Sequence, residues 1–133
     1  MKRILVAFDG GEPAVKALYK AIDLAKKYEA TIGVVSVVPF HPGRFPVDPW
    51  DDRAVHTKEL ADARAILLDE GIEADFIEPY GDPARTIEQV VEDGGYDTVV
   101  IGSRGLGPIS RVFRGSVSEH VATHAEATVV IAR

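Results

Sequence analysis

The segment from Gly102 to Ser116 combines residue types suited to binding an anion. Four of its fifteen residues are glycine, three are arginine and none is acidic, although the whole chain has a formal net charge of −6. Glycines let the backbone bend sharply and bring its N–H groups close to a ligand. The sequence Ser116-Val117-Ser118-Glu119 has the form of a capping box, which predicts a helix starting at Ser116. A helix N-terminus preceded by glycine is an anion site; the alternative is a surface loop whose arginines are solvated.

A second polar segment, Asp9-Gly10-Gly11-Glu12, follows the first apolar run of the chain. An aspartate at the carboxyl end of a strand can bind a ribose hydroxyl or a metal ion. It can equally be a turn residue whose carboxylate accepts a hydrogen bond from the nearby backbone. The sequence leaves both interpretations of Asp9 open.

Short apolar runs alternate with longer amphipathic segments along the chain. The apolar runs predict five strands, at residues 4–8, 32–38, 73–78, 98–101 and 128–132. The alternating charges of 73–78 are typical of a sheet edge. Four helices are predicted between the strands, at residues 13–25, 56–70, 83–91 and 116–124. The intervening segment 39–52 contains four prolines and is predicted to be a loop.

This strict alternation predicts an α/β fold in which one domain, residues 1–133, has a five-stranded parallel sheet, doubly wound and Rossmann-like, with helices on both faces. The strand order 3-2-1-4-5 is assumed from the fold type, and it reverses between the first and fourth strands. Ligands of such sheets bind beyond the carboxyl ends of the strands at the reversal. The loops that meet there follow Phe8 and Ile101, so the two polar segments are expected to form one site.

Composition excludes several classes of protein. The acidic balance argues against nucleic-acid binding, which favours a basic surface. No apolar run approaches the roughly 20 residues of a membrane helix, so no membrane partner is expected. The basic N-terminus precedes only five apolar residues and is interpreted as the start of a strand, not a signal peptide. The chain has no cysteine, which excludes thiolate metal sites and is compatible with a cytoplasmic location.

These segments together resemble the ATP-binding branch of the universal stress protein family. That branch carries a glycine, two residues, a second glycine, nine residues, and then glycine followed by serine or threonine. Gly102, Gly105, Gly115 and Ser116 match this spacing without insertion or deletion. The similarity extends over essentially the whole chain and is weakest at residues 39–56.

Two positions depart from the family pattern. Gly11 stands where serine is usual after Asp-Gly, and Thr128 replaces the usual proline before the last strand. Neither change affects the glycine spacing, so the expectation of a nucleotide site is unchanged.

The resemblance implies particular roles for individual residues. Asp9 and Gly10 would lie near the ribose and phosphates of ATP, and the backbone around Val37 would hold the adenine edge. Mg²⁺ or Mn²⁺ would accompany the phosphates, and the strand 128–132 would form a homodimer. The phosphates would be bound by backbone N–H groups and one hydroxyl from Gly102, Ser103, Arg104, Gly105, Gly115, Ser116 and Val117.

The function implied is that of a nucleotide-binding regulatory protein of the stress response. No general base stands out near the expected γ-phosphate, so no catalytic residue is assigned and at most slow ATP hydrolysis is expected. The alternative is a stress protein that binds partners and uses no nucleotide.

His120 and His124 are four residues apart on the predicted last helix, a separation that two ligands of one metal can share. The glutamate of a His-Glu-x-x-His motif is missing, because Val121 follows His120, and no third ligand is evident. The pair is therefore interpreted as surface histidines, and no metal site is predicted from it.

Overall fold

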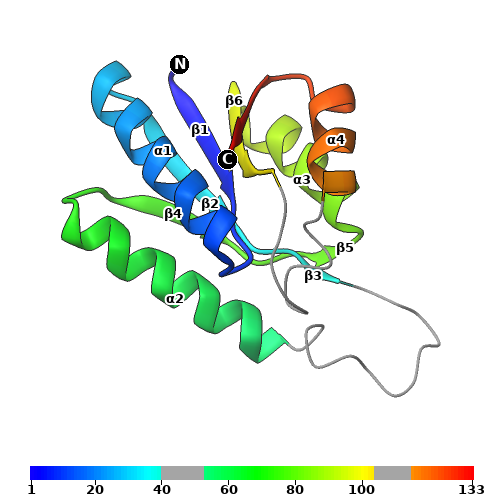
Figure 1. The fold of residues 1–133 in the computed structure, drawn as a ribbon, viewed down its shortest axis with the longest axis horizontal. Helices are drawn as coiled ribbons and strands as arrows, with labels where there is room; N and C mark the ends of the chain where they lie inside the picture. The colour runs from blue at the N-terminus through cyan, green and yellow to red at the C-terminus, as the bar shows by residue number, and fades with distance from the viewer. Residues whose placement is uncertain (40–52, 104–114) are drawn as a thin grey trace.

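The computed structural model describes residues 1–39, 53–103 and 115–133 of the chain. Its elements follow in an alternating order (Figure 1). They are β1 (Arg3–Ala7), α1 (Glu12–Tyr28), β2 (Thr31–Val35), β3 (Val38–Pro39), α2 (Arg53–Asp69), β4 (Ala74–Ile77), β5 (Tyr80–Gly81), α3 (Pro83–Gly94), β6 (Thr98–Gly102), α4 (Gly115–His124) and β7 (Thr128–Ala132).

Five of these strands form one sheet in the order β4-β2-β1-β6-β7. Every neighbouring pair in this sheet is parallel. Helices α1 and α2 lie on one side of the sheet, and α3 and α4 lie on the other (Figure 1). The predicted doubly wound parallel sheet, with the order 3-2-1-4-5 for its five strands, is therefore confirmed.

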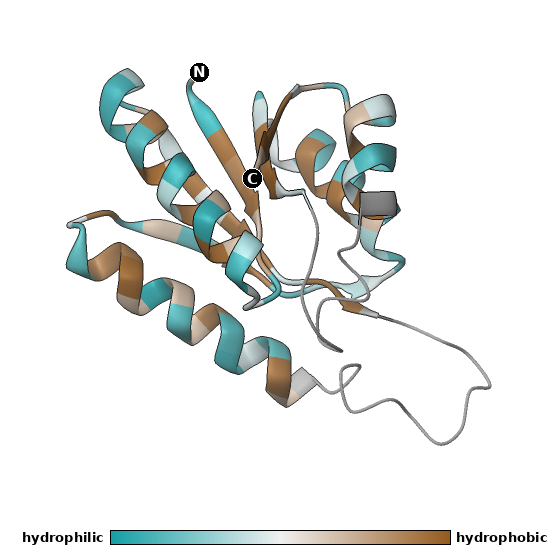
Figure 2. Ribbon diagram, in the orientation of Figure 1, coloured by the Kyte–Doolittle hydropathy of each residue, from teal (hydrophilic) through white to brown (hydrophobic). Residues whose placement is uncertain are grey.

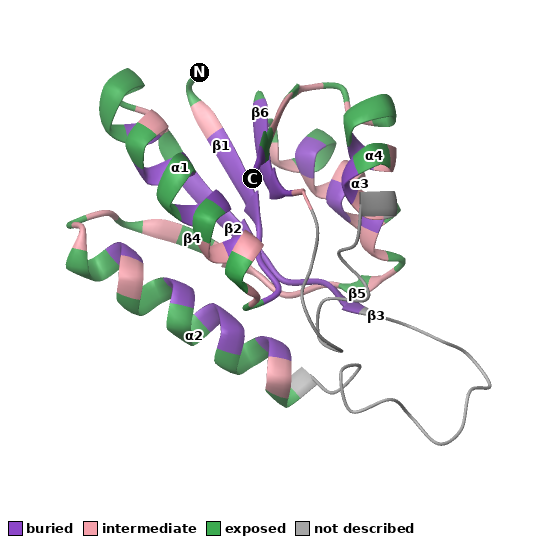
Figure 3. Cartoon of the chain, viewed as in Figure 1, coloured by how far each residue is buried: buried purple, intermediate pink, exposed green. Residues whose placement is uncertain are grey.

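The central strands of the sheet are buried on both faces, as the apolar run 4–8 predicts. Along β1, Ile4 and Val6 pack into a core with α1 and α2, whereas Leu5 and Ala7 pack into a second core with α3 and α4. The central strands β1, β2 and β6, which are largely brown in Figure 2, are largely purple and buried in Figure 3. The two cores fix the sheet between its helical layers and thereby fix the position of the strand ends.

The second strand is shorter than predicted. The apolar run 32–38 was expected to form one strand, but β2 ends at Val35. The Ser36 N–H donates to the carbonyl of Ile77, and the Val38 N–H donates to the carbonyl of Pro79. The chain then forms a separate two-stranded parallel sheet, β3 with β5. Ser36, directly after the break, is the one hydroxyl-bearing residue of this run, and a single serine is not enough to predict a break between strands.

The helix boundaries differ from the predictions by a few residues. Asp82 is confirmed as the N-cap of α3, and its side chain accepts a hydrogen bond from the Arg85 N–H at 3.2 Å. Helix α4 begins at Gly115, one residue before the predicted start at Ser116. Helix α1 extends to Tyr28, beyond the predicted end at residue 25. Within the described residues, no helix is both long and apolar enough to cross a membrane.

Candidate functional site

The carboxyl ends of β1 and β6 lie side by side where the strand order reverses. The loop after β1 leads into α1, and α4 begins at the same edge of the sheet (Figure 1). The side chain of Ser118, in the first turns of α4, donates to the carbonyl of Ser103 at 3.4 Å. This contact ties the end of β6 to α4 and brings the predicted residues of both segments to one edge.

Gly102 occupies a close contact between β6 and α1. A Cβ added at Gly102 would lie 2.8 Å from the Cβ of Pro13 and 2.9 Å from its carbonyl carbon. Gly102 is not among the described glycines with a positive φ, whereas Gly10 has a φ of 81°. The glycine at 102 is therefore required by packing against α1, and the glycine at 10 by its backbone conformation.

Asp9 is a buried carboxylate with one oxygen in use. Asp9 is only 3% exposed, and its Oδ1 accepts a hydrogen bond from the Gly11 N–H at 2.9 Å. Its Oδ2 is buried with no hydrogen-bond partner in the described part of the chain. Burial raises the pKa of Asp9, and the hydrogen bond from Gly11 opposes that shift. One carboxylate oxygen of Asp9 therefore stabilises the turn after β1. The other is available as an acceptor for a ligand.

The structure describes only some of the remaining predicted site residues. Val37 is fully buried and connects β2 to β3. Val117 is half-buried and packs against the second core. Gly115 and Ser116 are the first residues of α4, which agrees with a helix N-terminus at the site. Arg104 and Gly105 lie outside the described residues.

A buried polar cluster beside Asp9 was not predicted. The Nδ1 atom of His56 lies 2.8 Å from the Ser36 Oγ and 3.2 Å from a carboxylate oxygen of Glu59. Glu59 also contacts the first loop, because a Cβ added at Gly10 would lie 3.1 Å from its Cγ. Helix α2 therefore supplies two ionisable side chains to this edge of the sheet.

Glu59 holds a proton at neutral pH. Burial, and then the negative charge of Asp9, raise its pKa from the ordinary value of 4.5 to about 9. Neither carboxyl oxygen of Glu59 has a partner with hydrogen-bond geometry among the described residues, although His56 lies within ion-pair distance. Two neighbouring buried carboxyl groups resist ionising together, which is how Asp9 contributes to the raised pKa of Glu59.

The sequence did carry a signal for this cluster. The buried stripe of α2 is formed by Leu60, Ala63 and Leu67, which are three or four residues apart. His56 and Glu59 lie on the same stripe one turn earlier and are also buried. A charged residue on the apolar stripe of a helix needs a compensating partner, and this is the signal that the prediction of a plain Ala- and Leu-rich helix missed.

The edge combines donors and an acceptor. The N-termini of α1 and α4 present backbone N–H groups, which favour anions, and the N-cap of α1, Gly11, makes no side-chain capping bond. The Oδ2 of Asp9, without a partner among the described residues, can accept a hydrogen bond or bind a cation. Together these groups suit a ligand that carries both anionic and hydroxyl groups.

The family model for the universal stress proteins matches residues 1–133. Universal stress protein YxiE of Bacillus subtilis is 28% identical over 145 residues, covering 98% of this chain and 98% of that protein. A universal stress protein of Thermus aquaticus is 31% identical over 135 residues, covering 99% and 98%. The universal stress protein of Archaeoglobus fulgidus in complex with dAMP has the same fold, with a TM-score of 0.77 at 23% identity, covering 100% and 98%.

The family model matches the full chain, and a solved universal stress protein has the same fold. This chain belongs to the universal stress protein family.

Proposed function

We propose that this chain is a nucleotide-binding regulatory protein of the stress response, and that it binds ATP at the edge formed by β1, β6 and α4. The observation that carries the proposal is the unpartnered, buried Oδ2 of Asp9 at the reversal of strand order. A buried acceptor without a partner is costly unless a ligand or water satisfies it. At this position in a doubly wound sheet, a ribose hydroxyl is the expected donor.

Nucleotide complexes of similar proteins support the proposal. The Archaeoglobus fulgidus structure contains dAMP, and two further universal stress protein structures of the same fold contain cAMP and, in a protein from Arabidopsis thaliana, AMP. Adenine and ribose or deoxyribose are common to all three ligands. The choice of ATP for this chain rests on its glycine spacing and on the length of its basic segment.

The phosphates would be bound at the start of α4 and by the segment before it. Backbone N–H groups there favour negative charge, and so does the helix dipole. Asp9 would bind the ribose and Gly10 would lie beside the phosphates, while the buried backbone at Val37 would contact the adenine edge. The phosphate-binding residues would be Gly102, Ser103, Arg104, Gly105, Gly115, Ser116 and Val117.

A Mg²⁺ or Mn²⁺ ion would bind mainly through the phosphates. Such ions usually take one or two carboxylates together with phosphate oxygens and water. The one unpartnered oxygen of Asp9 among the described residues is assigned to the ribose, and the protonated Glu59 is a poor ligand, so the protein would contribute few metal ligands. The residues present therefore fit a metal that arrives with the nucleotide.

Efficient hydrolysis is not expected. A general base must be unprotonated and must reach the attacking water. Glu59 carries a proton at neutral pH, and Asp9 has the role of a ribose ligand. ATP occupancy would therefore act as a signal that changes partner contacts, with at most slow turnover.

We also propose that two copies pair through β7. This strand is at an edge of the sheet, and Ile131 is 39% exposed. An apolar edge strand without charges or proline favours pairing with another strand. A two-fold symmetric pair would satisfy the free backbone groups of both copies. Residues 1–133 would act as one domain, in the cytoplasm.

Calorimetry with ATP tests the nucleotide site. Asp9→Asn keeps an acceptor for the Gly11 N–H and replaces Oδ2 by a donor. We expect ATP affinity to fall about tenfold or more, since hydrogen bonds to charged groups contribute about 1.5–3 kcal/mol. Glu12→Gln, an exposed acid in the same loop, is the matched control and should bind as the unchanged protein does.

Mass spectrometry of ligand released from freshly purified, denatured protein separates the two functional hypotheses. An adenine nucleotide in the released fraction supports the proposed site. If no nucleotide is released and calorimetry shows no ATP binding, the alternative of a partner-binding stress protein without a nucleotide is favoured.

A further inference from the structure

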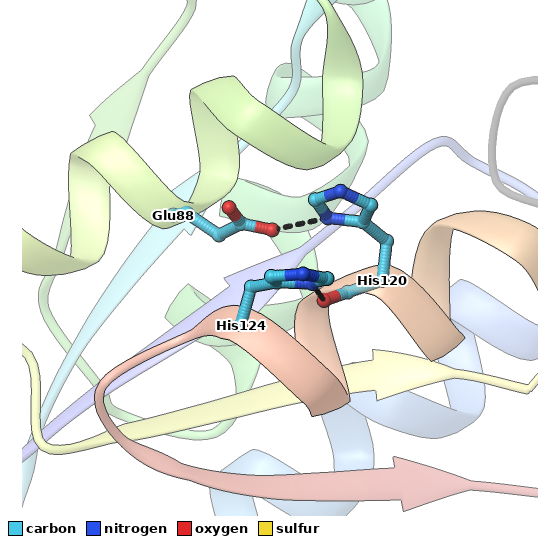
Figure 4. Close-up of side chains that lie close together, drawn as sticks. All are labelled: Glu88, His120 and His124. Carbon is cyan, nitrogen blue, oxygen red and sulfur yellow. Dashed lines mark hydrogen bonds and ion pairs between the residues drawn. The ribbon is translucent and has the colours of Figure 1, made fainter.

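Helices α3 and α4 pack side by side and bring three metal-ligating side chains together. Glu88 comes from α3, and His120 and His124 come from successive turns of α4 (Figure 4). One ligand atom from each of the three residues lies within 4.8 Å of the other two. The fold thus supplies the third ligand that the sequence did not reveal, from a residue 32 positions before His120.

The hydrogen bond of His124 leaves its other ring nitrogen able to bind a metal. The Nδ1 of His124 lies 2.9 Å from the backbone carbonyl of His120, and a carbonyl can only accept, so this nitrogen is the donor. In the neutral ring, Nε2 of His124 therefore has an available lone pair. A histidine whose other nitrogen donates to a carbonyl is the usual arrangement of a metal ligand.

Glu88 and His120 already interact. The Nδ1 of His120 lies 2.6 Å from the Oε2 of Glu88, and the rings of His120 and His124 are stacked at 4.1 Å. A tetrahedral Zn²⁺ site separates its nitrogen and oxygen ligands by about 3.3 Å, as bonds of 2.0–2.2 Å require. Glu88 and His120 lie closer than this, so a bound metal ion would replace their hydrogen bond; their side chains are 21% and 40% exposed and can adjust to it.

The three residues line an open groove with an excess of negative charge. The groove has a volume of about 880 Å³ and reaches the ends of α3 and α4. Four carboxylates line it (Glu88, Glu92, Asp97 and Glu126), together with a single arginine, Arg85. Clefts lined by one sign of charge concentrate ions of the opposite sign. The negative charge of the groove therefore attracts cations, and the open groove gives them access to the histidines.

We propose that Glu88, His120 and His124 form a binding site for Zn²⁺ or a similar divalent transition-metal ion, with the fourth position open to water. Two imidazoles and one carboxylate favour Zn²⁺, Co²⁺ or Ni²⁺ over Mg²⁺ and Ca²⁺, which bind mainly through oxygen. A three-residue site with one open position has the ligand number of catalytic zinc centres.

This site is separate from the nucleotide site. Helix α4 begins at the carboxyl edge of the sheet and ends at His124, shortly before β7 starts at the opposite edge. Tyr96 and Asp97, which precede β6, also line the groove. The proposed metal ion therefore lies toward the amino edge and does not depend on ATP.

Titration of the tag-free, nucleotide-free chain with Zn²⁺ in a calorimeter tests the proposal. We expect one Zn²⁺ per chain, no comparable binding of Mg²⁺, and a rise in the midpoint of thermal unfolding with Zn²⁺. Co²⁺ provides a second measurement, because a tetrahedral site gives it visible absorption bands that the hydrated ion shows only weakly.

Three variants identify the ligands. Glu88→Gln, His120→Ala and His124→Ala should each weaken Zn²⁺ binding by at least tenfold, since even outer-shell partners of a metal site typically contribute about 10–100-fold. Glu92→Gln removes a carboxylate of the same groove and helix, and His41→Ala removes a histidine elsewhere in the chain. Both controls should bind Zn²⁺ nearly as the unchanged protein does.

Three outcomes of these titrations can be distinguished. Loss of binding in all three variants, with unchanged far-ultraviolet circular dichroism and ATP affinity, supports the site. No binding to the unchanged protein overturns it. Equal binding in Glu88→Gln also overturns it, since that result leaves only a surface histidine pair.

Discussion

Gly102, the last residue of β6, packs directly against Pro13 in the first turn of α1. Gly102 ends the strand that leads into one segment of the proposed nucleotide site, and Pro13 follows the other segment; a Cβ at position 102 would lie 2.8 Å from the Pro13 side chain. The contact sets how closely the loops approach one another. A substitution here therefore changes the fold of the site before it changes any contact with a ligand.

The first prediction concerns this contact. Gly102→Ala should lower the free energy of unfolding by about 1–3 kcal/mol, because it inserts a methyl group where the backbone of α1 leaves no room. Urea unfolding measures the change. Ser103→Ala, at the adjacent position, leaves the Pro13 contact intact and should have a small effect. Equal stabilities of the Gly102→Ala and unchanged proteins would show that α1 moves freely away from β6.

The second prediction concerns pH. The folded-state pKa of Glu59 is raised from 4.5 to about 9, so between these values the folded chain binds more protons than the unfolded chain. Stability should therefore be greatest near the acid end of this window and fall as the pH rises toward 9. The raised pKa of Asp9 acts in the same direction.

Urea unfolding at a series of pH values tests this dependence. Glu59→Gln removes the titrating group, so its stability should change less with pH than that of the unchanged protein. Glu73→Gln, an exposed glutamate, should keep the original slope. Identical slopes in all three proteins would contradict the buried, protonated Glu59.

The third prediction concerns the arginines of the glycine-rich segment. Charges in solution act over about 8–10 Å at physiological salt, and we predict from the sequence that these side chains contribute long-range attraction rather than direct phosphate contacts. Replacing Arg104, Arg111 and Arg114 together by Gln should weaken ATP binding modestly and flatten its salt dependence. Replacing three lysines of α1 (Lys16, Lys20 and Lys27) by Gln is the charge-matched control. Complete loss of binding from one arginine variant would instead identify a direct phosphate contact.

The fourth prediction concerns assembly. Light scattering across micromolar concentrations should give twice the chain mass of 14.4 kDa. Ile131→Glu places a charge on the β7 edge and should shift the protein toward the monomer. Leu68→Glu changes an apolar residue on α2 that is 65% exposed and should leave the mass unchanged. A mass of 14.4 kDa at every concentration would exclude the proposed pair.

Much of the fold followed from local patterns. The buried strands are apolar on both faces, and Asp82 with Pro83 marks the start of α3, so alternation and caps predicted the sheet and its helices. The break after Val35 did not follow, because it depends on hydrogen bonds with Ile77 and Pro79, more than 40 residues away. Such pairing carries no signal in the hydropathy of a single run.

The residues of the two proposed sites were likewise only partly predictable from the sequence. Asp9 and Gly102 were predicted as site residues because loops at the reversal of strand order are recognisable in sequence, and the structure has both residues at that reversal. His56 and Glu59 lie on the apolar stripe of α2, and this signal was missed; that Glu59 lies against Gly10 depends on tertiary packing and could not be predicted. The pairing of Glu88 with His120 could not be predicted, since it depends on how α3 lies beside α4.

Helix α4 is the common element of both proposed sites, with its first residues beside the nucleotide and its last residue beside the metal ion. If a shift of this helix alters both sites, occupancy of one changes the affinity of the other. Thermodynamic reciprocity then requires that the factor by which Zn²⁺ changes ATP affinity equals the factor by which ATP changes Zn²⁺ affinity. If α4 is rigid, this factor is one, and Zn²⁺ and ATP bind to the protein independently of one another.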